Sequence, residues 1–165
     1  DRIQELPHTG VASAIDIGND RDIHPKNKQD VGTRLARWAL RDVYGKKDIT
    51  VTGPTYKEMK VEGNTVTISY DHVGGGLMTA KRKNSFQPVL ATPEAKLSSF
   101  AISGADQKWH WADALIEGNT VKLSSPAVAQ PVAVRYAYRG NPVNANLYNK
   151  DGLPAIPFRT DNKNP

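Results

Sequence analysis

The stretch ITVTGPTYKEMKVEGNTVTISYDHV, residues 49–73, sets the pattern for most of this chain. β-branched and polar residues alternate along it, as they do in a strand with one buried face and one solvated face. Gly53-Pro54 and Gly63-Asn64 interrupt the alternation with residue pairs that favour turns. The stretch therefore predicts short strands joined by tight turns.

The same pattern continues toward the carboxyl end, where Gly118-Asn119 marks another turn. Short strands separated by turns at intervals of about 8–12 residues are typical of an all-β sandwich. We therefore predict a mainly β fold with a β-sandwich domain over residues 48–139. Further strands are expected at residues 97–102, 109–116, 120–123 and 132–138.

The sequence before the sandwich predicts one strand and one helix. The apolar run VASAIDI, residues 11–17, suits a buried strand. Pro25 suits a helix start and Gly45 a helix end. Arg34 is expected elsewhere on the helix surface than the apolar stripe. That stripe comprises Val31, Leu35, Trp38, Ala39 and Val43.

One strand and one helix cannot form a domain, because a lone strand has no hydrogen-bond partner. We therefore expect residues 1–45 to be the last strand and helix of an incomplete α/β domain, whose other strands lie outside this chain. The alternative is that the helix packs on the sandwich. If the sheet is missing, the apolar face of the helix is poorly covered, and we expect the chain to self-associate.

Residues 140–165 are rich in proline and show no helical or strand period. Such a tail either docks on a neighbour or stays loose, and we expect it to dock back on the domain begun by residues 1–45. The run Gly74-Gly75-Gly76 permits close approach of a ligand or backbone, but a flexible connection between strands is the favoured interpretation.

Composition excludes several classes of protein. The net charge is +5, but the basic residues are dispersed and accompany no aromatic reader motif, so nucleic-acid binding is not expected. No apolar run approaches the roughly 20 residues that span a bilayer. Cysteine is absent, and the spacing of His72 and His110 supports no metal site, so we expect no cofactor. We expect a periplasmic or secreted location, although no signal peptide is visible.

The loop after the expected first strand carries a carboxylate and a histidine, Asp22 and His24. A serine hydrolase needs a histidine to take the proton of the serine and a carboxylate to orient the imidazole. Asp16 and Asp20 compete with Asp22 for the role of the acid. By itself, an Asp-x-His on a loop is more often a solvated surface feature.

The sequence around this loop, IDIGNDRDIHPKNKQDVGTRLARWAL followed by YG, resembles the carboxyl-terminal histidine block of the sialate O-acetylesterases, which are SGNH (GDSL-type) hydrolases. Further segments similar to that family follow in the same order. They are VGGGL at residues 73–77, FAISGAD at 100–106, PVAVRYAY at 131–138 and NLYNKDGLPAIPFRTD at 146–161.

The resemblance implies an esterase that removes O-acetyl groups from sialic acids or related sugars without a metal. His24 would be the general base and Asp22 its orienting partner. The wider superfamily places the acid three residues before the histidine, where this chain has Arg21. The Gly-Asp-Ser-type block of the nucleophile is absent, since no serine here follows an aspartate. We therefore expect the serine to lie outside this chain and the chain alone to be inactive.

The sequence WHW, residues 109–111, suggests an alternative function. Alternation in a strand sends Trp109 and Trp111 to one face and His110 to the other. Paired aromatic rings can stack on sugars, as in a noncatalytic carbohydrate-binding module. The favoured interpretation is that one or both tryptophans fill the sandwich core.

Overall fold

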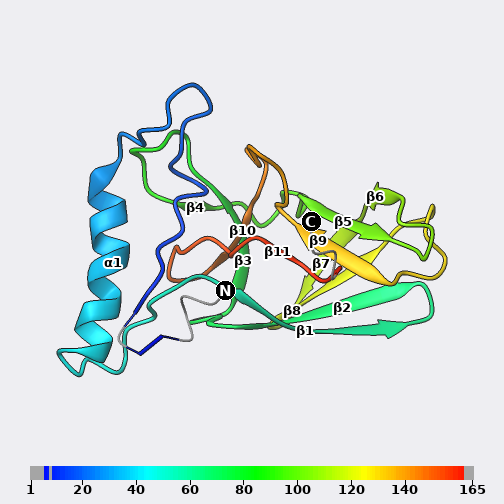
Figure 1. The fold of residues 1–165 in the computed structure, drawn as a ribbon, viewed down its shortest axis with the longest axis horizontal. Coiled ribbons are helices and arrows are strands. Elements are labelled where there is room, and N and C mark those ends of the chain that lie inside the picture. Colours follow the sequence, from blue (N-terminus) through cyan, green and yellow to red (C-terminus); the bar gives the residue numbers. More distant parts are fainter. Residues whose placement is uncertain (1–5, 8, 162–165) are drawn as a thin grey trace.

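The computed structural model describes residues 6–7 and 9–161, and most of these residues form or connect antiparallel strands (Figure 1). The mainly β fold is therefore confirmed. The elements of the described residues are α1 (Lys28–Asp42), β1 (Thr55–Glu62), β2 (Thr65–Asp71), β3 (Leu77–Lys81), β4 (Leu90–Ala91), β5 (Phe100–Ser103), β6 (Trp109–Trp111), β7 (Asp113–Glu117), β8 (Thr120–Ser124), β9 (Ala133–Tyr136), β10 (Leu147–Asn149) and β11 (Phe158–Arg159).

The strands of the described residues form two four-stranded sheets and one three-stranded sheet. Their orders are β1-β2-β8-β7, β11-β9-β5-β6 and β10-β3-β4. The inward side chains of β2, β5, β8 and β9 share one apolar core, so the predicted β-sandwich is confirmed. The most deeply buried members of this core include Val66, Ile68, Phe100, Ile102, Val121, Leu123, Val134 and Tyr136.

Two of the three predicted glycine turns, at Gly63 and Gly118, close hairpins of the first sheet. Gly63 joins β1 to β2 and Gly118 joins β7 to β8, and each has φ near +61°. A side chain is strained at this φ, whereas glycine adopts it freely. Turn chemistry that is visible in the sequence therefore sets the register of both hairpins.

The proline-rich tail contributes two short strands to the sheets, although its sequence shows no strand period. β10 pairs with β3, and β11 pairs with β9. The buried amide of Asn149 donates to the carbonyl oxygens of Thr52 and His72, and Phe158 stacks on Tyr56 at 4.9 Å between ring centroids. The partners of these residues are distant in the sequence, so no local hydrophobic period predicts the strands.

The glycine run before β3 accommodates this tail. A Cβ on Gly74, where φ is +53°, would lie 1.8 Å from the Oδ2 atom of Asp151. The backbone amide of Lys150 donates to the carbonyl oxygen of Gly76. The close approach is therefore made by the tail of this chain, and the run is more than a flexible connection.

Residues 11–17 do not form a strand, so this prediction is wrong. They run as irregular chain with a turn at residues 15–17, between α1 and the strands (Figure 1). A buried strand needs a neighbour to take its backbone hydrogen bonds, and no described strand lies beside it. Ile17 is nevertheless 1% exposed, so the segment is packed in place.

The predicted helix is confirmed, with a start slightly later than Pro25. The Asn27 side chain caps α1 by accepting from the backbone amide of Asp30 at 2.9 Å. At the other end, Gly45 has φ of +70°. Within the described residues, no helix has the length and apolarity needed to span a bilayer.

The face that α1 presents to the rest of the molecule differs from the predicted one. Arg34 is the buried residue of the helix, whereas Leu35 is 49% and Val43 69% exposed. Trp38 also faces inward, where its indole nitrogen donates to the carbonyl oxygen of Val11. Because Leu35, Ala39 and Val43 are all exposed, we call these three residues the outer stripe.

Candidate functional site

The loop between residues 18 and 27 brings together the two residues predicted to be catalytic. The Nδ1 atom of His24 lies 3.1 Å from the Oδ1 atom of Asp22. The same carboxylate oxygen accepts the backbone N–H of His24 at 2.9 Å. The two contacts fix the loop locally and hold the imidazole against the carboxylate.

The charge state of Asp22 suits an orienting partner. The backbone amide of His24 and then its imidazole lower the pKa of the Asp22 carboxyl group below its ordinary value. The group therefore stays ionised near neutral pH. A carboxylate in this position favours the imidazole tautomer with hydrogen on Nδ1 and stabilises the imidazolium that forms when the ring takes a proton.

The imidazole is open to its surroundings. The side chain of His24 is 83% exposed. Its Nε2 atom has no hydrogen-bond partner among residues 6–7 and 9–161. With Nδ1 engaged by Asp22, Nε2 is the atom free to accept a proton from an incoming hydroxyl group.

Asp16, which competed for the role of the acid, is engaged elsewhere. Its two oxygens accept from Arg34 at 2.7 and 2.8 Å, and Arg82 donates to one of them at 2.9 Å. The carboxylate is only 4% exposed. The structure thus brings Asp22, and not Asp16, into contact with His24. Asp16 instead ties the base of the loop to α1 and to the segment after β3.

Two further contacts tie α1 to the segment after β3. The Asn27 amide donates to the carbonyl oxygen of Ser85, and Arg82 also pairs with Asp30 at 2.8 Å. Sequence reasoning missed this network, because its members are separated by many residues and no local pattern links them. The one available signal was a lone aspartate, Asp16, inside an otherwise apolar run.

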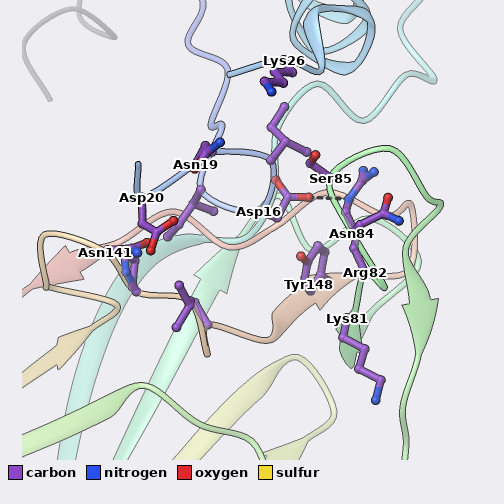
Figure 2. A pocket seen from close by; sticks show the side chains of 16 residues that line it. Asp16, Asn19, Asp20, Lys26, Lys81, Arg82, Asn84, Ser85, Asn141 and Tyr148 are labelled. Atoms are coloured by element: carbon purple, nitrogen blue, oxygen red, sulfur yellow. Dashed lines mark hydrogen bonds and ion pairs between the residues drawn. The ribbon is translucent and has the colours of Figure 1, made fainter. Parts of the chain in front are cut away.

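A pocket of about 390 Å³ opens beside this network (Figure 2). Its lining includes the segment from Ile15 to Asp20, Arg82 and the loop at residues 141–143. Figure 2 shows Asn141 beside Asp20 and Arg82 beside Asp16. Burial raises the pKa of Tyr148, whose hydroxyl also lines the pocket and therefore keeps its proton. The pocket offers charged groups of both signs and a hydroxyl, which suits a polar ligand. His24 lies outside the lining, on the same loop.

The tryptophans of the WHW sequence are not in the sandwich core, which corrects the favoured interpretation. Trp111 is 61% exposed and Trp109 is half-buried. Both take part in a hollow of about 260 Å³ that includes Arg135 and Arg139. The buried Ile102 of β5 pairs in register with His110, whereas Trp109 and Trp111 pair with Ser103 and Ala101, so both indoles lie on the outer face of the sheet.

Comparisons with known proteins place these features in a family. No family model matches the chain. The sialate O-acetylesterase of Rattus norvegicus is 30% identical over 170 residues, an alignment that covers 93% of this chain and 28% of the rat protein. The Homo sapiens sialate O-acetylesterase is 29% identical, with 93% of this chain and 29% of the human protein aligned.

A solved structure agrees with the sequence relatives. The crystal structure of a carbohydrate acetylesterase from Xanthomonas citri matches 97% of this chain with a TM-score of 0.85 and 42% identity. The chain spans 34% of that protein, and less than a third of each mammalian relative. By sequence and by fold, the chain belongs to the sialate O-acetylesterase family.

Proposed function

We propose that this chain is the carboxyl-terminal part of an esterase that removes O-acetyl groups from sialic acids or related acetylated sugars. His24 acts as the general base, Asp22 orients it, and a serine outside this chain is the nucleophile. The observation that carries the proposal is the contact of 3.1 Å between Asp22 and an exposed His24, in a chain related to sugar acetylesterases.

The proposed reaction follows from the chemistry of this pair. The Nε2 atom of His24 takes the proton of the serine hydroxyl as its oxygen attacks the acetyl carbonyl carbon. The resulting imidazolium gives that proton to the sugar oxygen, which leaves as a hydroxyl group. Water, activated by the same imidazole, then releases acetate and restores the serine. Throughout, the ionised Asp22 stabilises the charged ring.

The arrangement of the chain supports a nucleophile that comes from elsewhere. The imidazole is exposed, and α1 beside it carries the outer stripe, which no described residue covers. A further part of the polypeptide that packs on the outer stripe could bring its serine to the same side as the loop. We therefore propose that the sheet of the hydrolase domain covers α1 in the longer protein.

The test uses the product of the complete reading frame that contains this chain. We expect His24→Ala to lower kcat for an O-acetylated sialic acid by about 1,000-fold or more, because the nucleophile loses its base. Asp22→Asn should lower kcat strongly with an unchanged melting temperature. Asp16→Asn should instead lower the melting temperature, because its partners Arg34 and Arg82 are left without their carboxylate.

A matched control is His72→Asn, since His72 lies after β2 with positive φ, a conformation that asparagine tolerates. This variant should keep normal turnover. Near-normal activity of the His24→Ala variant would overturn the assignment of His24. Normal activity of Asp22→Asn together with a folded, inactive Asp16→Asn would move the role of the acid to Asp16.

A further inference from the structure

The outer surface of the β11-β9-β5-β6 sheet carries aromatic rings interleaved with guanidinium groups. Arg135 lies 4.0 Å from the ring centroid of Trp109, and Arg139 lies 5.3 Å from that of Trp111. Tyr138 stands next to Arg135 at 5.1 Å. We call these five residues the aromatic platform. They come from β6, from β9 and from the residues that follow β9, and β5 lies between these two strands in the sheet.

At one end of the platform, the polar groups are paired with other residues of this chain. Arg135 pairs with Asp161 at 2.6 Å, and Arg159 pairs with the same carboxylate at 2.6 Å. Arg159 also donates to the hydroxyl of Tyr138. This end is rigid, because each group is fixed by several partners. Two guanidinium groups nevertheless share a single carboxylate, so the local charge remains positive.

The other end of the platform, formed by Trp111 and Arg139, has groups that can contact a ligand. Trp111 is 61% exposed, although burial of a tryptophan side chain is strongly favourable. Arg139 forms no ion pair with any residue in the described part of the chain, and it lies over the Trp111 ring. The indole is largely exposed and the guanidinium has no ion-pair partner among the described residues, so both groups are accessible to a ligand.

The hollow formed by the platform limits the size of a ligand. Its volume is about 260 Å³, slightly below the roughly 300–1,000 Å³ of typical small-molecule pockets, which suits a single ring. A smaller hollow of about 190 Å³ is lined by Trp111, Arg139 and residues 141–144. Asn141 and Val143 also line the pocket beside the His24 loop, so one loop borders all three hollows.

The chemistry of these groups selects a class of ligand. The π face of an indole is negative and apolar, and it attracts the C–H groups on one face of a sugar ring. A guanidinium group binds a carboxylate by two parallel hydrogen bonds. We propose that the aromatic platform is a binding subsite for a carboxylate-bearing sugar, which stacks on Trp111 and pairs with Arg139. Only its use in positioning a substrate rests on the esterase proposal, since the binding itself needs no nucleophile.

The test is calorimetric titration of this chain with the methyl glycoside of N-acetylneuraminic acid. We expect saturable binding in the millimolar range. The methyl ester of the same sugar lacks the negative charge and should bind the unchanged chain about tenfold more weakly than the acid does. The Arg139→Met variant should likewise bind the acid about tenfold more weakly than the unchanged chain does. Trp111→Ala should weaken binding of the acid and of the ester alike, because the ring face serves both.

Two controls keep the test specific. Lys122→Met removes an exposed charge from β8, and Leu115→Ala removes an exposed apolar side chain from β7, both on the other four-stranded sheet. Each should bind within twofold of the unchanged chain. Equal affinity for acid and ester, or no saturable binding of the acid sugar, would overturn the proposal. Neither outcome involves His24, so the esterase proposal would stand or fall separately.

Discussion

The β-sandwich and the segment formed by residues 9–45 are held in place by different forces. The sandwich buries side chains such as Ile68, Ile102 and Leu123 completely. The amino-terminal segment packs Ile17 but is also anchored by polar contacts, among them the buried pair of Asp16 with Arg34. Figure 1 shows the result, with α1 along one side of the molecule and the sandwich on the other.

This difference explains why the chain is folded although some apolar side chains of α1 remain exposed. An apolar core gains free energy from burial, and the sandwich closes its own core. A polar anchor fixes position without covering the apolar side chains nearby. The outer stripe of α1 thus stays exposed although the helix is firmly placed. In a longer protein, a further domain could pack on this exposed stripe.

The largest expected effect comes from breaking the sandwich core. Phe100 is 1% exposed and lies 4.6 Å from Tyr136 between ring centroids. We expect Phe100→Ala to lower the free energy of unfolding by about 3–5 kcal/mol, because the cavity in the core cannot close fully. Urea unfolding followed by circular dichroism measures the change. Leu115→Ala, at a 60% exposed position, should change it by less than about 0.5 kcal/mol.

The second effect comes from breaking the polar anchor. Arg34→Met should destabilise the amino-terminal segment by about 2–3 kcal/mol, less than for an isolated buried pair, because Arg82 still holds Asp16. Hydrogen exchange should show faster exchange of the α1 amides and little change in β2 and β8. The matched variant is Arg37→Met, which removes one hydrogen bond to the carbonyl oxygen of Thr50. Equal loss of protection in the sandwich would contradict separate anchoring.

The sandwich was predictable because its signals are local. Alternation within each strand and the glycines at positions 63 and 118 are visible in a short window of sequence, and the structure confirms both. The helix was predictable for the same reason. The contact between Asp22 and His24 also lies within a few residues, so its geometry could be anticipated from a turning loop.

The features that could not be predicted depend on partner residues that are distant in the sequence. Residues 11–17 have the composition of a buried strand, but strand formation requires a neighbour that the described chain does not supply. The burial of Arg34 depends on Asp16 and Arg82, which no helical period reveals. The strands of the tail depend on free edges at β3 and β9. In each case the missing information was the partner.

A third, smaller effect concerns the polar contact that holds the tail on β9. Hydrogen bonds from Arg135 and then from Arg159 lower the pKa of Asp161 from 3.8 to about 2. Because the folded-state pKa is the lower one, this carboxylate stabilises the fold above about pH 4, and the contribution is lost as the pH falls toward 2. Asp161→Asn should therefore cost about 1 kcal/mol at pH 5 and almost nothing at pH 2. Unfolding at both pH values measures the gap, and a gap independent of pH would contradict this origin.

The smallest effect on stability is expected at the outer stripe, where Leu35 and Val43 are exposed. Replacing both by serine should change the free energy of unfolding by less than about 0.5–1 kcal/mol, because little burial is lost and only helix propensity changes. The same variant should lose self-association, which light scattering of the unchanged chain should detect as it is concentrated. A large loss of stability would mean that the stripe is already packed. A wild-type chain that stays monomeric at high concentration would contradict the expected self-association and would count against an apolar helix face that awaits a partner.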